Sequence, residues 1–251
     1  MASDTGKGAG HKYRRIAADL QAAIDRGEFG PGDRLPGENV LAERYNVAAM
    51  TARQALHLLR SQGIAESRRG AGFYVQSWRP IRRRGIPRLA RDQWGSGKSI
   101  WEADDDRALD VDQLRIERTT APPRFAEMLE IEPGDALTRS RRYLLDGRPV
   151  LLAVSWFDNG LVDGTPIAVP DSGPGGVYAR LADLGRAPVR FKESIRAQLP
   201  GEEEAERLKM PPERAVLRVV RTAFDANGKV VEINAMAADS AAYILEYEFD
   251  A

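Results

Sequence analysis

The sequence predicts an α+β protein built from two parts, a small helical part at the N-terminus and a larger, mainly antiparallel α+β part after it. Helical periodicity dominates roughly the first 60 residues and then gives way to a hairpin pattern. Beyond about residue 111, strands with period-two alternation are joined by hairpin turns, with short helices between them. Such runs argue against a doubly wound parallel sheet. At 251 residues the chain is long enough for two domains, each with its own core.

The N-terminal part reads as three helices followed by a β-hairpin. Apolar residues recur at helical spacing over residues 13–24, 38–45 and 50–61, and glycines follow the first and third of these stretches. The hairpin is expected over residues 64–75, with a basic, glycine-rich tip at residues 68–72. A hairpin directly after two helices joined by a tight turn suits a wing that lies along a groove of DNA.

The third predicted helix has two different faces. One side is apolar, whereas the other carries the hydrogen-bonding side chains Thr51, Arg53, Gln54 and His57. Base edges in the major groove are read by donors and acceptors of this kind. Helical periodicity occurs in any small helical domain, and a basic tip is often an ordinary turn. The prediction of DNA binding therefore depends on the ordered combination of helices and hairpin.

Charge divides the chain near the same place as the periodicity. Residues 1–91 hold 17 Lys and Arg against 8 Asp and Glu, a net charge of +9, while the rest holds 20 against 29, a net charge of −9. A basic part of this size is expected for a protein that binds a polyanion, since each cation placed on a phosphate releases condensed counterions. The acidic part should point away from that partner.

Composition excludes several other classes of protein. The chain has no Cys, and His11 and His57 lack the spacing of metal ligands, so we expect no disulfide, thiol nucleophile, cofactor or metal site. No apolar run approaches the roughly 18 residues of a membrane span. The first ten residues do not resemble a signal peptide. We therefore expect a cytoplasmic protein with no membrane partner.

Three stretches of the N-terminal part resemble a known family. They are PGDRLPGENVLAERYNV, TARQALHLLRSQG and RRGAGFYV, and together with residues 13–17 they are similar to the winged helix-turn-helix of the GntR family of bacterial transcription regulators. The resemblance covers residues 11–76. The residues that this resemblance and the outer face of the third helix assign to DNA binding are Arg34, Asn39, Thr51, Arg53, Gln54, His57, Arg69, Gly70 and Gly72.

Two departures from the family pattern fall in this region. Ala48 and Ala49 stand where the family usually has Ser and Arg, and Asn39 stands where Arg is frequent. The missing donors imply weaker phosphate contacts or an altered operator. They leave Thr51, Arg53 and the wing with a larger share of the binding.

The C-terminal part alternates strands with short helices. The pairs Asp146-Gly147 and Asn227-Gly228 are strong signals for hairpin turns. Strands are expected over residues 113–120, 136–145, 148–157, 188–198, 215–224, 230–238 and 243–249, the last of them ending the sheet. Helices are expected over residues 122–129, 177–184 and 202–208.

Two stretches of this part resemble a second domain. PPRFAEMLEIEPGDALTRSRRYLLDGRPVLLA and GEEEAERLKMPPERAVLRVVRTAFDANGKVVE are similar to the UTRA ligand-binding domain, which defines the HutC subfamily of GntR regulators and shares the fold of chorismate lyase. The resemblance covers about residues 98–249 and implies an effector pocket over the sheet. It assigns effector contacts to Arg141 and Glu232, with Tyr143 at a position that is usually basic. We also expect Ser99 to line an effector loop.

Gly176 stands at a helix start where the family commonly has a Ser that cradles a phosphate. Together with Tyr143 it argues against a sugar phosphate, and it predicts a less anionic metabolite, with a single carboxylate. A guanidinium such as that of Arg141 clamps a carboxylate well. In an alternative interpretation, Arg139 and Arg141 point outward and pair with Glu232 across the strands. Tyr143 itself fits a core aromatic better than a ligand stacker.

The domain organisation follows from these patterns. We expect a disordered tail over residues 1–10, the winged helix-turn-helix over 11–76, a linker over 77–97, and an effector-binding and dimerisation domain over 98–251. Prolines, glycines and the loss of periodicity indicate the linker. Its arginine run at residues 82–84 either contacts phosphates or is solvated.

The sequence thus predicts a homodimeric repressor that binds an inverted-repeat operator on double-stranded DNA and responds to a small-molecule effector. Two alternatives stay open, a chorismate-lyase-like enzyme and a repressor of the plasmid-transfer type without an effector. No nucleophile with a partner base can be assembled, which favours a protein that is not an enzyme. Gly97-Lys98-Ser99 resembles the end of a phosphate-binding loop, but Asp92 stands where that motif requires Gly.

Overall fold

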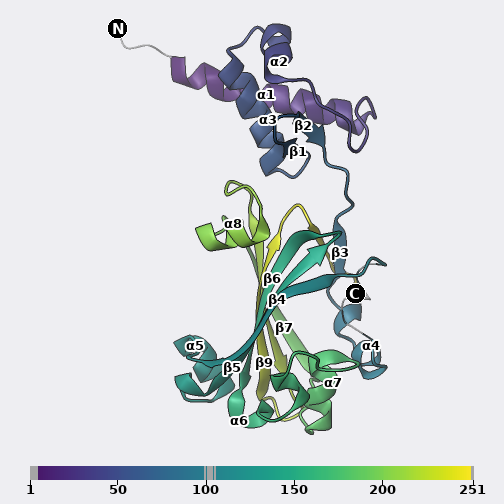
Figure 1. Cartoon of the computed structure of the whole chain (residues 1–251), viewed down its shortest axis with the longest axis vertical. Helices are drawn as coiled ribbons and strands as arrows, with labels where there is room; N and C mark the ends of the chain where they lie inside the picture. Colours follow the sequence, from purple (N-terminus) through teal and green to yellow (C-terminus); the bar gives the residue numbers. More distant parts are fainter. Residues whose placement is uncertain (1–4, 99, 101–103, 105, 250–251) are drawn as a thin grey trace. The chain divides into compact units, whose positions relative to one another are not determined.

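The computed structural model describes residues 5–98, 100, 104 and 106–249, and the chain divides into two compact units, Met1–Arg79 and Pro80–Ala251 (Figure 1). The first unit is helical with one hairpin, and the second is built on an antiparallel sheet with helices on both faces. The predicted α+β fold class is confirmed. No helix of the described residues is both long and apolar enough to cross a membrane.

The first unit contains three helices and a two-stranded sheet. The helices are α1 (Thr5–Asp25), α2 (Glu38–Tyr45) and α3 (Ala49–Ser61), and the strands are β1 (Ala65–Arg68) and β2 (Gly72–Val75), which pair antiparallel. Apolar side chains from all three helices and both strands form one core, which includes Leu20, Leu41, Leu56, Ala65 and Val75. The predicted order of three helices and a wing is therefore present.

The turn between α2 and α3 is set by a left-handed residue. Asn46 has φ 49° and ψ 58°, and its backbone N–H reaches the carbonyls of Ala42 and Glu43 at the end of α2. Asn tolerates this conformation better than most residues with a side chain. The tight turn lets α3 start only four residues after α2 ends.

The start of the chain differs from the prediction. α1 begins at Thr5, so residues 5–10 are helical where a disordered tail was expected, and residues 1–4 lie outside the described part. Residues 5–10 show no apolar periodicity, because the residues of α1 that pack into the core, such as Ile16 and Leu20, lie further along the helix. Once a helix has nucleated, each added residue gains a hydrogen bond without a new nucleation cost.

The second unit is built on a six-stranded sheet in the order β4-β5-β6-β9-β8-β7, and all neighbours are antiparallel. The strands are β4 (Asp110–Thr119), β5 (Ala136–Leu145), β6 (Arg148–Asp158), β7 (Arg190–Gln198), β8 (Val216–Phe224) and β9 (Val230–Asp239). Both predicted Gly-containing hairpin turns are confirmed. The β5–β6 turn has positive φ at Asp146 and Gly147, as a primed two-residue turn requires.

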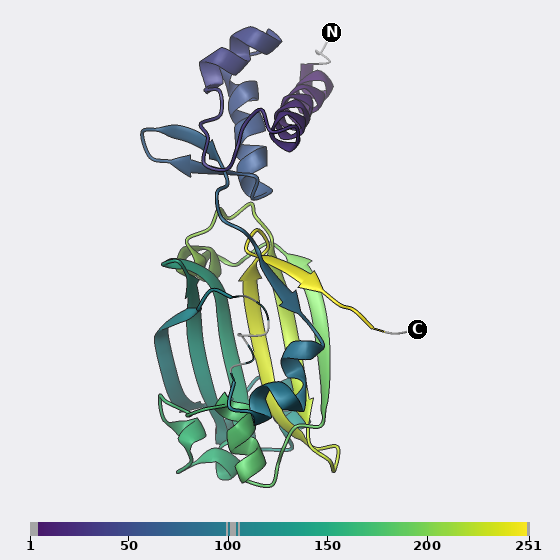
Figure 2. The ribbon, with the colours of Figure 1, turned by 90° about the vertical axis from the view of Figure 1, so that its right-hand side faces the viewer.

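Helices cover the two faces of this sheet at different places (Figures 1 and 2). α5 (Pro123–Leu129) and α8 (Glu202–Leu208) pack on one face through separate apolar clusters, one around Trp156 and the other around Leu152. α4 (Arg91–Gly95) and α7 (Gly176–Asp183) lie over the opposite face, where Trp94 and Leu181 join an apolar core with Phe157 and Tyr178. Short helical turns fill the connections at α6 (Asn159–Val162), η1 (Pro87–Leu89), η2 (Pro133–Asp135) and η3 (Pro166–Ala168).

The segment predicted as a linker over residues 77–97 is folded for most of its length. β3 (Ile81–Arg84) pairs in parallel with β10 (Tyr243–Glu246), so β10 does not end the main sheet as expected. Ile81, Arg83 and Trp94 are buried. The segment reads as irregular because its elements are short, and their burial comes from distant residues that local periodicity cannot show.

Candidate nucleic-acid interface and effector pocket

The outward face of α3 carries the side chains expected to read DNA. Met50, Arg53, Gln54 and His57 follow one another at helical spacing, opposite a face formed by the buried Ala52, Ala55, Leu56 and Leu59. Gln54 and Arg53 are exposed, and Thr51 is half-buried. Met50 is 59% exposed on this face, and the sequence analysis did not select it. A large exposed apolar side chain at the start of a polar face was the signal that could have found it.

Arg53 is held by an acidic residue of α2. Its Nε donates to both carboxylate oxygens of Glu38 at 2.9 Å, and its side chain stays 51% exposed. Hydrogen bonding to Glu38 and the charge of that carboxylate raise the pKa of Arg53. The guanidinium therefore has a protein partner that a DNA phosphate or base would have to share or replace. Exposed pairs of this kind are weak, so the exchange is inexpensive.

Four of the predicted DNA-contacting residues gather at the wing. Gly70 and Gly72 adopt φ +72° and +103°, which side chains rarely adopt. A Cβ at Gly72 would lie 3.5 Å from Nε of Arg34, and Arg34 forms a β-bridge with Tyr74. Arg69 is exposed in the turn. The tip thus presents backbone and two cations without bulky side chains between them.

The remaining predicted residues lie elsewhere on the first unit. The His57 ring packs edge-on against Phe73 of β2, with ring centroids 5.5 Å apart, and it is half-buried. It links α3 to the wing in addition to belonging to the outward face. Asn39 is exposed on α2, next to the Glu38 that pairs with Arg53.

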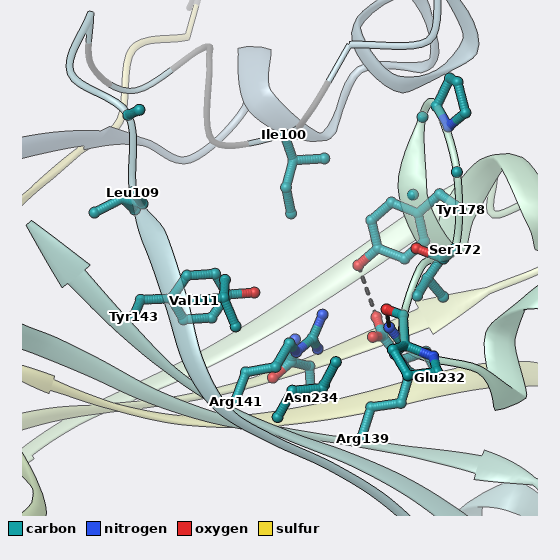
Figure 3. Close-up of a pocket in the computed structure, with 18 of the residues that line it drawn as sticks. Ile100, Leu109, Val111, Arg139, Arg141, Tyr143, Ser172, Tyr178, Glu232 and Asn234 are labelled. Carbon is teal, nitrogen blue, oxygen red and sulfur yellow. Dashed lines mark hydrogen bonds between the residues drawn. The ribbon is translucent and has the colours of Figure 1, made fainter.

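A pocket of about 720 Å³ lies on the α7 side of the second unit (Figure 3). Its floor is formed by part of one row of register partners, and this row crosses the neighbouring strands β5, β6, β9, β8 and β7. The row consists of Arg139, Ser155, Asn234, Arg221 and Glu193. Direct cross-strand neighbours share a face of the sheet, so these side chains point to the same side. All but Ser155 and Glu193 line the pocket.

Arg141 points into the pocket, as predicted (Figure 3). Its Nη2 donates to Oγ of Ser155 at 2.6 Å, and its guanidinium is 5.9 Å from the ring centre of Tyr143. Glu232 is 2% exposed and accepts a hydrogen bond from the hydroxyl of Tyr178 at 2.7 Å. The alternative of an outward Arg141–Glu232 ion pair is therefore wrong. Tyr143 is buried and lines the pocket, so it is both a core aromatic and a wall residue.

Arg139 has a positioning role that the sequence analysis missed. It is 3% exposed and donates to the backbone carbonyls of Ile167 at 2.6 Å, of Pro170 at 3.0 Å and of Val169. Burial, followed by the charge of Arg141, lowers the pKa of Arg139 to about 10. The side chain therefore remains a cation at neutral pH. It ties the segment around η3, which forms one wall, to the pocket floor.

Arg221 is the other pocket residue that the sequence analysis did not select. It is 1% exposed, and its Nε and Nη1 have no hydrogen-bond partner within the described ranges. Burial alone would lower the pKa of Arg221, but Tyr178 and Glu232 raise it. Oδ1 of Asn234, its register partner, is likewise without a partner among the described residues. Neither residue carries a local signal, because only the pairing of β8 with β9 brings them together.

The glycine-rich wall beside α7 is shaped by close packing. A Cβ at Gly175 would lie 2.5 Å from the carbonyl oxygen of Trp94, so only glycine fits between α4 and α7. Gly176, the first residue of α7, lines the pocket and offers no hydroxyl there. Ser99, the remaining predicted effector residue, lies outside the described residues. No group of acidic residues and histidines in the described parts has the arrangement of a metal site.

Two family profiles match the chain. The profile of bacterial regulatory proteins of the gntR family matches residues 12–75, and the profile of the UTRA domain matches residues 105–243. A winged helix-turn-helix followed by a pocket-bearing UTRA domain is the organisation of a DNA-binding transcription regulator. The chain belongs to the GntR-family regulators that carry a UTRA domain.

Similar proteins match over most of the chain. An uncharacterized HTH-type transcriptional regulator of Streptomyces coelicolor is 29% identical over 231 residues, which cover 88% of this chain and 86% of that protein. The mannosyl-D-glycerate transport/metabolism system repressor MngR of Escherichia coli is 28% identical over 229 residues, covering 89% and 90%.

Solved structures agree with the fold. A crystal structure of a GntR-family transcriptional regulator superposes with a TM-score of 0.63 at 26% identity and covers 96% of this chain and 98% of that one. PhnF from Mycobacterium smegmatis gives a TM-score of 0.57 at 23% identity, covering 94% and 99%. Both the fold class and the two resemblances derived from the sequence are confirmed.

Proposed function

We propose that this regulator acts in the cytoplasm as a homodimeric repressor, that it binds an inverted-repeat operator, and that a small molecule in the pocket of the second unit releases it. The observation that carries the proposal is that one chain contains both a basic winged helix-turn-helix and a pocket whose floor holds buried cations. The relative MngR is named as a repressor. One winged helix reads only a few base pairs, so useful specificity requires two.

The DNA-contacting surface in this proposal has two parts. The outward face of α3, with Arg53 at its centre and Asn39 on the adjacent helix, enters the major groove. The wing, with Arg34 and Arg69 beside two bare glycines, follows the neighbouring backbone. Exposed cations and glycine backbone suit phosphate contacts, whereas Thr51 and Gln54 suit base edges.

Selection of binding sites from a random duplex library tests the proposal that a dimer binds an inverted-repeat operator. We expect the selected sites to be inverted repeats, bound far more tightly than either half-site, with affinity that falls steeply as salt rises. Light scattering should show a dimer. A stable monomer that binds one half-site as tightly as the whole site would contradict the proposal.

The effector arm assigns the ligand to Arg141, Tyr143 and Glu232, with Ser99 as a predicted contact. Gly176 lacks the hydroxyl of a phosphate cradle, which supports a metabolite with a single carboxylate. The name of MngR refers to mannosyl-D-glycerate, a sugar joined to one carboxylate, and a ligand of that class would suit the size and charge of the pocket.

A thermal-shift screen of metabolites on the wild type and on Arg141→Ala tests this arm, followed by operator titration with each hit. We expect a ligand that stabilises the wild type, stabilises the variant less, and weakens operator binding. A ligand that stabilises both equally and leaves operator binding unchanged would remove the pocket from the proposal. If no compound in the screen binds the pocket while the protein still binds its operator, the repressor without an effector would be favoured. Turnover of a hit would favour the chorismate-lyase-like enzyme.

A further inference from the structure

The buried side chains that line the pocket carry more positive charge than their own carboxylates balance. Among the fully buried side chains there, Arg139 and Arg221 are cations, whereas Glu232 is the one carboxylate that the described residues supply. Glu193 is a register partner of Arg221, but it forms an ion pair with Arg83. Arg83 reaches both of its oxygens, and the hydroxyl of Tyr247 also donates to it at 3.0 Å. Buried charge is costly unless it is paired, so one negative charge is missing.

The two buried arginines differ in what their N–H groups already do. Both terminal nitrogens of Arg139 donate to backbone carbonyls, three in all, and only its Nε is buried without an acceptor in the described part of the chain. Arg221 has two buried nitrogens, Nε and Nη1, with no acceptor in the described part of the chain. Beside the row, Arg141 is half-buried, and its Nε is also without an acceptor there. The missing anion is therefore best placed against Arg221, with Arg141 next to it.

A second unpaired group lies beside the position proposed for this anion, and it requires a hydrogen-bond donor from the ligand. Asn234 lies directly opposite Arg221 in the register of β8 and β9, and its buried Oδ1 has no donor among the described residues. Figure 3 shows Asn234 beside Arg141 at the bottom of the pocket. A buried acceptor without a partner costs free energy, and a ligand hydroxyl would remove that cost.

We propose that Arg221 and Asn234 form a binding position for a 2-hydroxy carboxylate. The carboxylate accepts from Arg221 and Arg141, and the hydroxyl on the neighbouring carbon donates to Oδ1 of Asn234. The proposal rests on the proposed effector function of this pocket and adds the chemical group that its floor recognises. Arg139 serves as a positioning residue that holds the wall.

Glycolate is the smallest molecule with this pair of groups, and it is the probe we choose. In the full-length protein, the Arg Nε–H and Asn side-chain amide signals are followed by NMR while glycolate, acetate or inorganic phosphate is added. Arg221→Lys and Asn234→Ala assign the signals. We expect glycolate to shift the Arg221 and Asn234 signals together, and acetate to bind roughly fivefold more weakly because it lacks one hydrogen bond.

The variants separate the two contacts. Asn234→Ala should bind glycolate and acetate equally, and Arg221→Met should bind neither. Arg218→Met is the matched control, because Arg218 lies on the same strand but pairs with Glu204 on the opposite face. It should bind glycolate as the wild type does. Phosphate that binds through Arg221 more tightly than glycolate would overturn the proposal in favour of a phosphate site, and glycolate that leaves Arg221 unshifted would overturn it outright.

Stability without ligand gives an independent readout. Arg221→Met removes the surplus buried cation, so its melting temperature should equal or exceed that of the wild type. Arg139→Met removes three hydrogen bonds to the wall and should melt lower. A lower melting temperature for both would make Arg221 a structural residue and contradict the proposal.

The two levels of the proposal fail differently. If a screened metabolite releases the operator but glycolate leaves Arg221 unshifted, the effector function stands and the 2-hydroxy carboxylate position is wrong. If glycolate binds through Arg221 but no compound alters operator binding, the position stands and the effector function is wrong.

Discussion

The two units of this protein use arginine in opposite ways. In the first unit, Arg53 and Arg68 are about half-exposed and sit in surface ion pairs with Glu38 and Glu66. In the second unit, Arg88, Arg139 and Arg221 are almost completely buried. The net charge reveals only the first kind, because the buried arginines belong mostly to the part whose net charge is negative. Net charge therefore indicates a polyanion partner but not a pocket for a small anion.

The difference in burial implies a difference in cost. An exposed ion pair contributes little and can exchange its carboxylate for a phosphate. A buried arginine cannot exchange its carboxylate partner in this way, because the carboxylate would then stay buried without a compensating charge. We expect substitutions of the exposed, paired arginines of the first unit to change DNA binding at constant stability, and substitutions of the buried, paired arginines of the second unit to change stability first.

The largest effect is expected for the buried pair of Arg88 and Asp104, whose side chains are 0% and 1% exposed with Nη1 and Oδ2 2.7 Å apart. Arg88→Met should lower the free energy of unfolding by about 3–5 kcal/mol, because it leaves Asp104 buried without its cation. Urea unfolding monitored by Trp fluorescence measures it. Adding Asp104→Asn should recover part of the loss. A double variant as unstable as the single one would show that the charge is not the cause.

A smaller, pH-dependent effect is expected at Glu193. Burial opposes its ionised form, but the hydrogen bond and charge of Arg83 outweigh it, so the pKa of Glu193 lies below its usual value of 4.5. A carboxyl with a lowered pKa stabilises the fold above the unfolded pKa, and that stability is lost as pH falls through the folded pKa. Urea unfolding between pH 7 and pH 3 should therefore show a flatter pH dependence for Glu193→Gln than for the wild type. Parallel curves would contradict this expectation.

DNA binding should respond to Arg53 while stability does not. Arg53→Ala should weaken operator binding roughly 5- to 150-fold if Arg53 reads a base, with specificity relaxed at one position. If it contacts a phosphate, binding should weaken on all sequences and the salt slope should fall by about 1. Fluorescence anisotropy at several salt concentrations distinguishes these results. Arg26→Ala, which breaks a comparable exposed pair with Glu28, is the control and should bind normally.

The smallest effect is expected at Met50, the exposed apolar residue on the same face of α3. An apolar side chain in the major groove contacts the methyl group of thymine. Met50→Ala should then weaken operator binding by about 1 kcal/mol, the order expected when one thymine methyl group loses its apolar contact. Replacing single thymines of the operator by uracil should identify the contacted base in the wild type and have no effect there in the variant. Equal sensitivity in both proteins would place Met50 away from the bases.

The sequence by itself determined the parts of this protein that depend on neighbours along the chain. Helical spacing fixed α2 and α3, and the Asp146-Gly147 pair fixed the β5–β6 hairpin because both residues accept positive φ. The same locality made the outward polar face of α3 visible, since residues three and four apart share a face. Arg141 and Glu232 were predicted for the pocket from resemblance, and both line it.

Tertiary structure alone decided which distant strands became neighbours. Arg139, Asn234 and Arg221 come from three strands, and they form one floor only because β9 inserts between β6 and β8. The same holds for β3, which pairs with β10 from the far end of the chain and so turns a predicted linker into part of the fold. Sheet pairing is set by hydrogen bonds and burial between segments far apart in sequence. The local periodicity of apolar residues therefore does not predict which strands will pair.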